Sequence, residues 1–170
     1  MKKFIALCLC LFFSFSFAAC GSEDTPTKEQ NEISSTKTTT KDTFGLNETA
    51  AFKDLKFTAT EIKESEGDNF FTPEEGNIFV GVKFTIENVS EEEQAVSSIL
   101  LFEAYADDIK CDYSISAACA FDDALDGSIA PGKKLVGWYA VEVPENWSDL
   151  ELNVQSTWLS SKNATFKFTK

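Results

Sequence analysis

A strict two-residue alternation over residues 77–88 constrains the fold of this chain more than any other feature. Val80, Val82, Phe84 and Ile86 fall on one face, and the small or polar residues Gly81, Lys83, Thr85 and Glu87 fall on the other. Because successive side chains of a strand point to opposite faces of a sheet, this pattern predicts a half-buried β-strand. Such a strand needs neighbouring strands and a second layer to bury its apolar face.

Further strands are predicted after residue 50. The polar cluster 88–93 predicts a loop before an apolar run from Val96 to Tyr105, which predicts another strand. Pro131 and Gly132 are turn residues that place a hairpin or a strand crossing at 130–133. Alternating apolar residues recur at Phe57 and Ala59, over Leu135–Val143, over Leu150–Val154, and at Phe166 and Phe168.

The number and spacing of these segments predict the fold class. About seven short strands, joined by Gly, Pro and Asn turns and without a convincing amphipathic helix, indicate an all-β antiparallel β-sandwich. The stretch 112–126 stays unassigned, since its alanines, Phe121 and Leu125 fit either a short helix or a loop.

Two blocks of this sandwich resemble a known family. Leu125 to Pro144 contains a Gly, then Pro-Gly-Lys, then a strand that ends in Val-Pro, and Gly76 to Asn88 forms a long strand that ends in Asn. Both blocks are similar to the immunoglobulin-like domain of unknown function found on lipoproteins of Gram-positive bacteria. The resemblance implies a fold and a location, and it brings no established activity and no catalytic residues.

The first 19 residues predict a lipoprotein signal peptide. Lys2 and Lys3 precede an apolar run of about 14 residues, whereas a membrane-spanning helix takes roughly 20. The junction Phe17-Ala18-Ala19-Cys20 resembles a bacterial lipobox, which implies that Cys20 carries a diacylglyceryl group. The alternative is an ordinary secretory signal that leaves a free protein. Two or more acyl chains anchor a protein stably, so the expected location is the extracytoplasmic face of the cell membrane.

Residues 20–43 are predicted to form a lipidated, disordered linker, and residues 44–170 a single sandwich domain. From Gly21 to Thr43 the chain is rich in Ser, Thr, Lys and Glu, and Ile33 is its only aliphatic residue. Such a stretch cannot bury enough apolar area to offset the loss of chain entropy.

Charge and residue inventory exclude several function classes. The chain has 15 basic and 28 acidic residues, and this acidity disfavours nucleic acid as a partner. It contains no His and no Arg, which removes His-dependent catalysis and bidentate phosphate clamps. A carboxylate pair could still support glycoside hydrolysis, but on so acidic a chain solvated surface carboxylates are expected instead. We therefore expect no enzyme activity.

Two candidate stabilising sites follow from the acidic and thiol residues. Cys8 and Cys10 leave with the signal, so Cys111 and Cys119 remain as a candidate disulfide, with two buried thiols as the alternative. No resident cofactor is expected apart from possible Ca²⁺, which prefers several oxygen ligands. Its candidate ligands are Asp107, Asp108, Asp112, Asp122, Asp123 and Asp126, and the alternative is that they are solvated residues of acidic loops, since their spacing fits no EF-hand pattern.

Phe70, Phe71 and Trp147 lie among polar turn residues and are the aromatics expected to be exposed for binding, although most aromatics of a sandwich are core. The leading hypothesis is a non-catalytic surface module that binds an envelope protein or polymer. The alternatives are a small-ligand or calcium-binding lipoprotein and, last, a carboxylate-dependent hydrolase.

Overall fold

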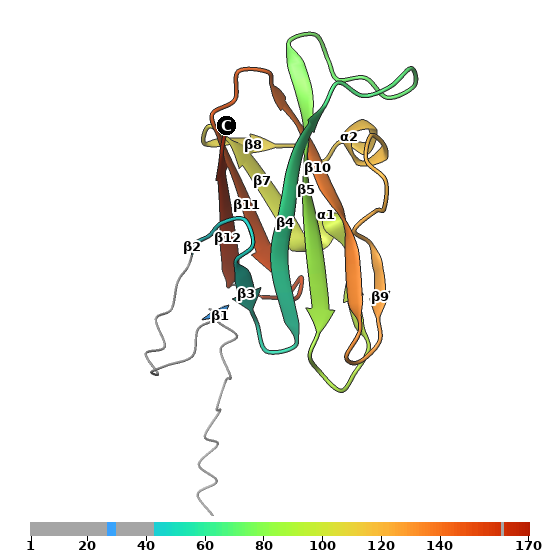
Figure 1. The fold of residues 1–170 in the computed structure, drawn as a ribbon, viewed down its shortest axis with the longest axis vertical. Helices are drawn as coiled ribbons and strands as arrows, with labels where there is room; N and C mark the ends of the chain where they lie inside the picture. Colours follow the sequence, from blue (N-terminus) through green and yellow to red (C-terminus); the bar gives the residue numbers. More distant parts are fainter. Residues whose placement is uncertain (1–26, 30–42, 161) are drawn as a thin grey trace, which may run out of the picture.

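The alternating segments pair into two sheets that pack face to face as a β-sandwich (Figure 1). The structure is a computed structural model that describes residues 27–29, 43–160 and 162–170. Sheet A has the order β1 (Thr27–Glu29), β3 (Thr49–Ala51), β4 (Leu55–Ser65), β5 (Asn77–Asn88) and β10 (Lys134–Pro144). Sheet B has the order β2 (Thr43–Phe44), β12 (Asn163–Thr169), β11 (Asp149–Gln155), β7 (Phe102–Ala106) and β8 (Ile109–Cys111). A small third sheet pairs β6 (Gln94–Val96) with β9 (Gly127–Ile129).

The predicted all-β sandwich is confirmed, and its strongest strand has the predicted bounds. β5 spans Asn77–Asn88 and lies between β4 and β10, antiparallel to both. The pairing of β2 with β12 is parallel, unlike the other strand pairs described. Six described strands have five or more residues, and the other six have two or three. The prediction of about seven strands is therefore close to the number of longer strands, and it did not include most of the short ones.

The apolar run from Val96 to Tyr105 is not the single strand that was predicted. Val96 ends β6, and a four-residue helix, α1 (Ser98–Leu101), intervenes before β7 begins at Phe102. Ser98 donates its backbone N–H and its hydroxyl to the two carboxylate oxygens of Asp126, at 2.9 and 2.7 Å. A side chain far along the chain therefore fixes the turn, and local periodicity cannot reveal it.

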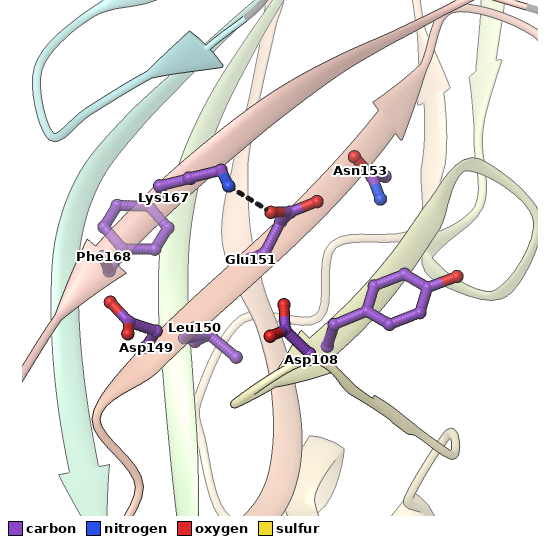
Figure 2. A pocket seen from close by; sticks show the side chains of 8 residues that line it. Asp108, Asp149, Leu150, Glu151, Asn153, Lys167 and Phe168 are labelled. Carbon is purple, nitrogen blue, oxygen red and sulfur yellow. Dashed lines mark ion pairs between the residues drawn. The ribbon is translucent and has the colours of Figure 1, made fainter.

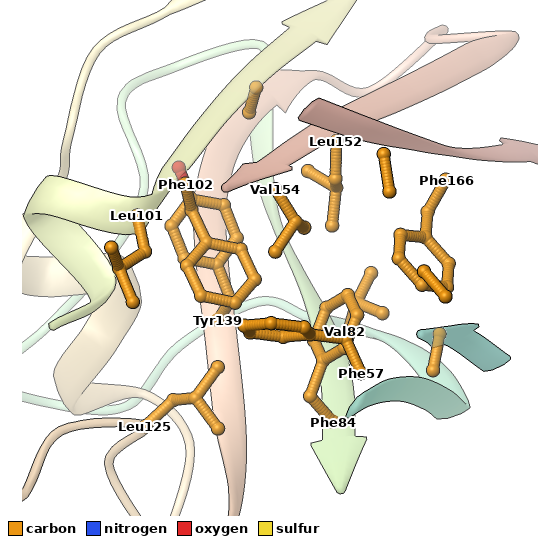
Figure 3. Packing of buried hydrophobic residues seen from close by; sticks show 14 of the residues in the cluster. Phe57, Val82, Phe84, Leu101, Phe102, Leu125, Tyr139, Leu152, Val154 and Phe166 are labelled. Carbon is orange, nitrogen blue, oxygen red and sulfur yellow. The ribbon is translucent and has the colours of Figure 1, made fainter. Parts of the chain in front are cut away.

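The core between the sheets is rich in phenylalanine (Figure 3). Phe84 of β5 meets Phe166 of β12 edge to face at 5.2 Å, and Tyr139 of β10 stacks on Phe102 at 4.9 Å. Offset and edge-to-face contacts of this kind add to the free energy gained by burying the rings. Each sheet contributes rings to these pairs, so they hold the two layers together.

The unassigned stretch 112–126 covers the edge and the outer face of sheet A. It contains the five-residue helix α2 (Ile115–Cys119), and its flanks form isolated bridges from Tyr113 to Val141 and from Ala124 to Trp138. Phe121 packs where a Cβ on Gly81 would lie only 2.6 Å from its ring, and it contacts Trp138 at a centroid distance of 5.1 Å. The absence of a side chain at Gly81 thus makes room for the ring.

Phe79 shows why this cover is needed. It points away from the main core, yet it is fully buried in a second cluster with Ala117 of α2 and Ala140 of β10. Phe79 shares a face of β5 with Gly81 and Lys83, opposite the core residues Val80 and Val82, so its apolar side chain faces outward from the sandwich. Residues 112–126 bury it, so this face of sheet A is not solvated there.

Parts of the predicted linker are strand. Residues 27–29 form β1, which pairs antiparallel with β3, and Thr43 belongs to β2 rather than to the linker. The prediction of disorder over 20–43 is therefore wrong for these residues. Polar composition can still supply an edge strand, because the ladder is made by backbone groups. The predicted signal peptide and Cys20 lie outside the described residues.

The two blocks that carry the family resemblance meet at one end of the sandwich. Asn88 donates its backbone N–H to the carbonyl of Lys133, and Gly132 donates to the carbonyl of Asn88, both at 3.0 Å. The fully buried Asn88 amide donates to the carbonyls of Ile129 and Glu92, at 2.8 and 2.7 Å. The turn at 130–133 is a strand crossing, because β9 and β10 belong to different sheets.

Within the described residues, none of the helices has the length and hydropathy needed to cross a membrane.

Candidate functional site

The sandwich has two different ends (Figure 1). The proximal end, at the bottom of Figure 1 near β1, carries loop 89–93, turn 130–133 and the loop before β12. The distal end, at the top, carries loop 66–76, the β7–β8 turn at 107–108, loop 145–148 and Lys170. Because β1 lies toward the proximal end, the distal end faces away from the first described strand.

A pocket of about 400 Å³ opens at the distal end between the edges of the two sheets. β8, the last strand of sheet B, contributes all three of its residues to the wall, and the end of β10, the last strand of sheet A, contributes Glu142 and Pro144. The remaining wall comes from Glu74, Asn77, Ala106, Asp107, Asp112, Tyr113 and Ser114. We call this the distal pocket.

Two acidic side chains of the distal pocket hold its walls in place. Glu142 accepts hydrogen bonds from the backbone N–H of Glu74 at 2.7 Å and from the amide of Asn77 at 3.0 Å. Asp107 accepts from the backbone N–H groups of Ser148 and Asp149, at 3.1 and 3.0 Å. These bonds fix loop 66–76 against β10 and the β7–β8 turn against loop 145–148 and the start of β11, so both carboxylates have structural roles.

Two other carboxylates of the pocket have no such partner. In the described part of the chain, the side chains of Glu74 and Asp112 make no hydrogen bond and no salt bridge, and both residues are exposed. The only lysine in the wall, Lys110, pairs with Glu103 at 3.1 Å, and this hydrogen bond raises the pKa of Lys110. The charge of Asp112 also raises the pKa of Lys110, and with four carboxylates and one lysine the wall of the pocket carries an excess of negative charge.

The floor of the pocket has an apolar component. Ile109 is 73% exposed, and Tyr113 is 41% exposed, although both are apolar enough to be buried in a core. Cys111 lies beside them, and partial burial raises the pKa of its thiol, so the thiol is protonated near neutral pH. An open surface that combines apolar groups with a few polar ones is a common property of ligand sites.

A salt-bridge cluster stiffens the distal end next to this pocket. The indole of Trp147 donates to Glu64 at 2.8 Å, and the ammonium of Lys170 pairs with the same carboxylate at 2.7 Å. Lys170 also donates to the carbonyl of Glu145 at 2.9 Å. The Lys170 hydrogen bond lowers the pKa of Glu64, partial burial opposes this effect, and the Trp147 bond reinforces it.

A second, smaller hollow of about 350 Å³ lies on the outer face of sheet B (Figure 2). Glu151 of β11 and Lys167 of β12 cross it as an ion pair at 2.6 Å, and that hydrogen bond raises the pKa of Lys167. Asn153 accepts from the hydroxyl of Thr165 at 2.6 Å. Within this hollow, Glu151 and Lys167 are thus paired with one another, and Asn153 is held by Thr165.

The six aspartates proposed for Ca²⁺ do not gather into one site. In residues 27–29, 43–160 and 162–170, no group of three or more acidic or thiol side chains is placed to hold a metal ion. The aspartates serve turns instead: Asp107, Asp108 and Asp123 have positive φ, which Asp tolerates well, and Asp126 binds the start of α1. Asp112 lies at the distal pocket, and Asp122 is exposed.

The proposed disulfide is not present in the structure. Cys111 on β8 is half-buried and Cys119 at the end of α2 is exposed, and both have free thiols. The alternative of two buried thiols does not fit Cys119 either. Residues 112–126 are pinned by the Phe121 packing and by the two bridges to β10 rather than by a covalent link.

The three aromatics expected at the surface have three different environments. Phe70 is 87% exposed at the tip of loop 66–76, where Asp68 accepts from the backbone N–H groups of Phe70 and Phe71. Phe71 is half-buried. Trp147 is buried, so its predicted exposure is wrong; its neighbours are polar because its indole N–H needs an acceptor.

The family of the chain is decided by residues 44–165, which match the domain of unknown function DUF4352. The chain belongs to the DUF4352 family. The matched segment begins in β2 and ends within β12, so it includes strands of both sheets and loops of both ends. None of the curated proteins matches this sequence.

Solved structures show the same fold as the DUF4352 domain at low sequence identity. A presumed lipoprotein, ycdA, from Bacillus subtilis subsp. subtilis strain 168 has a TM-score of 0.56 and 16% identity over 68% of this chain. That match spans 36% of the Bacillus subtilis chain, so this chain spans about a third of its relative. The matches to the other two similar structures span nearly the full length of those proteins.

A conserved hypothetical protein from Bacillus anthracis has a TM-score of 0.53 and 12% identity, and the match covers 72% of this chain and 94% of that one. An uncharacterized beta-sandwich protein from Clostridium difficile 630 has a TM-score of 0.52 and 14% identity, with 81% and 100% coverage. At these identities the likeness of the DUF4352 domain to them concerns the fold alone.

Sequence reasoning missed most of the distal pocket of the DUF4352 domain. Glu142 could have been noticed as an acidic residue on the face of its strand opposite the core residues. Nothing local shows that Glu74 and Asp112, 38 positions apart in the sequence, share a pocket. Ile109 gives a weak signal, since it is an apolar residue directly after the Asp107-Asp108 turn.

Proposed function

We propose that this protein is a lipid-anchored, extracytoplasmic protein whose sandwich is a non-catalytic binding module for an envelope protein or polymer. The distal pocket carries the proposal: it combines exposed apolar side chains with unpaired carboxylates at the end that faces away from β1. A tethered domain binds a partner most easily with the end that is farthest from its anchor.

The location rests on the lipobox resemblance at Cys20 and on the fold shared with a presumed lipoprotein of Bacillus subtilis. A Cys20→Ser variant, which cannot carry the diacylglyceryl group, should move from the membrane pellet to the soluble fraction. Intact mass of the detergent-extracted wild type should match residues 20–170 plus a diacylglyceryl group. A Cys20→Ser protein that stays in the pellet would contradict the lipid anchor.

We also propose that the sandwich is immunoglobulin-like. In that fold, strands B and E lie in one sheet, and strands C, F and G lie in the other. β5 and β10 are neighbours in sheet A, and β7, β11 and β12 are consecutive neighbours in sheet B, which supports this assignment. The distal pocket would then lie at one end of the sandwich, beside the loop that joins β4 to β5 and the turn that joins β7 to β8.

The absence of His and Arg from the sequence supports a non-catalytic function. A carboxylate-dependent hydrolase would need two carboxyl groups about 5 to 10 Å apart, across a bound sugar. Glu142 and Asp107 are occupied by hydrogen bonds that hold the loops, which disfavours them as an acid and a base. Turnover of any substrate in a glycoside panel, lost in Glu74→Gln, would overturn this part of the proposal.

The binding function is tested by capture from envelope extracts with full-length protein in detergent. An Ile109→Asp variant places a charge on the exposed apolar floor of the distal pocket and should lose the captured partner. A matched control, Leu46→Asp, changes another exposed apolar residue away from the pocket and should keep it. Equal capture by both variants and wild type would mean that the distal pocket is not the binding site.

A further inference from the structure

The open edge of sheet B runs along the distal pocket. β8 is the last strand of that sheet and pairs only with β7 among the described strands. All three of its residues line the pocket, so a ligand in the pocket lies alongside the β8 backbone. Edge strands carry unpaired N–H and C=O groups that can pair with an added strand.

The opposite wall of the pocket is formed by the end of β10, and the backbone edge of this strand is already paired. β10 is the last strand of sheet A, and the bridges from Tyr113 to Val141 and from Ala124 to Trp138 cover its edge. The pocket therefore has one open backbone edge and one closed side wall. This geometry suits an extended peptide better than a compact small molecule.

The charge of the pocket selects the side chain that such a peptide would insert. The wall has four carboxylates and one lysine, and the lysine is already paired with Glu103. Asp107 and Glu142 are held by hydrogen bonds, whereas Glu74 and Asp112 have none in the described part of the chain. These two carboxylates line the same pocket as the exposed Ile109 and Tyr113, and together they complement a group with an aliphatic stem and a positive end.

We infer that the distal pocket binds a lysine-bearing peptide segment, which adds to β8 as an extended strand and places its lysine ammonium between Glu74 and Asp112. Ile109 and Tyr113 would pack against the aliphatic part of that lysine. The inference rests on the proposed binding function, and it names the chemistry that the same site would recognise.

The direct test uses a short peptide, acetyl-Thr-Val-Lys-Val-Thr-amide, and full-length protein in detergent. Its affinity is compared with that of a norleucine peptide, which keeps the aliphatic stem and lacks the charge. Two partly exposed ion pairs should make the lysine peptide bind about five- to tenfold more tightly at low salt. The double variant Glu74→Gln/Asp112→Asn should reduce that ratio to about one.

Backbone pairing is tested separately by N-methylation of the two peptide valines, which removes donors without changing the lysine. We expect the methylated peptide to lose most of its affinity. Unchanged affinity, or equally tight binding of pentylamine, would overturn strand addition in favour of a simple amine site. Equal affinities of the lysine and norleucine peptides would overturn the charge recognition.

Two cysteines provide an internal check on the location. Under reducing conditions, the lysine peptide should slow the alkylation of Cys111, which lines the pocket, and leave that of Cys119 unchanged. Equal protection of both cysteines, or of neither, would place the peptide elsewhere. If Ile109→Asp abolishes envelope capture while the lysine peptide fails to bind, the peptide inference fails and the proposed function still stands.

Discussion

The two ends of the sandwich differ in how completely their polar groups are satisfied. At the proximal end, Asn88 is fully buried, and both atoms of its side-chain amide have partners in loop 89–93 or β9. At the distal end, Glu74 and Asp112 face an open pocket without a hydrogen bond in the described part of the chain. The proximal end, whose buried polar groups have partners, is therefore suited to stabilising the fold, and the distal end, whose rim carboxylates lack hydrogen bonds, is suited to binding.

The family resemblance belongs to the stabilising end. The strand that ends in Asn88 and the Pro131-Gly132 turn were recognised as separate motifs, and the structure shows that they bind one another. A motif that closes a sandwich tells us the fold and says little about the ligand.

The largest expected effect is at the proximal end. Asn88→Ala would remove two donated hydrogen bonds and leave the carbonyls of Ile129 and Glu92 without that partner inside the protein. We expect the free energy of unfolding to fall by about 3 kcal/mol, measured by urea denaturation. A loss below about 1 kcal/mol would show that this end is not the stabilising one. Asn153→Ala, at an exposed sheet face, is the matched control.

Removal of one buried hydrogen bond at the distal end should lower the free energy of unfolding less than Asn88→Ala does. Trp147→Phe keeps an aromatic ring against the core and removes the indole N–H that donates to Glu64. We expect a loss of about 1 kcal/mol in the free energy of unfolding, since the carboxylate keeps Lys170 as a partner. A loss as large as that of Asn88→Ala would remove the difference between the two ends.

The same cluster predicts a pH dependence. The folded-state pKa of Glu64 lies below its ordinary value of 4.5, so its contribution to stability is present above that value and is lost as the pH falls through the folded pKa. Glu64 is about a third exposed, so we expect the contribution to stay below about 1 kcal/mol. Below pH 5, the melting temperature of wild type should therefore fall more steeply than that of Glu64→Gln. Parallel curves would contradict a stabilising pair.

The sequence predicted the strands well because their alternation is a local property. The bounds of β5 and the strand over 134–144 follow from apolar residues two apart, and the turn at 130–133 follows from Pro131 and Gly132. Residues 112–126 could not be placed, since their cover of β5 depends on Gly81 and Phe121, which are 40 positions apart. Pairings over such distances are set by tertiary packing and leave little trace in local periodicity.

The candidate sites were predicted less well than the strands, for a related reason. Acidic residues near one another in sequence suggested a metal site, yet Asp107 and Asp126 bind backbone groups of different loops. Trp147 was expected at the surface because its neighbours are polar, while its indole needed the acceptor Glu64, 83 positions away. Residue type alone does not show which partner satisfies a polar group.

The smallest expected effect on stability is at the rim of the distal pocket. Glu74→Gln/Asp112→Asn removes two exposed negative charges that make no hydrogen bond or salt bridge in the described part of the chain. The free energy of unfolding should stay within about 0.5 kcal/mol of wild type, because exposed carboxylates without partners contribute little to folding. If the rim carboxylates serve binding, this stable variant should lose the charge-dependent part of peptide affinity measured by titration calorimetry. A marked loss of stability would mean that the rim supports the fold. The two ends of the sandwich would then differ only in how much each contributes to stability.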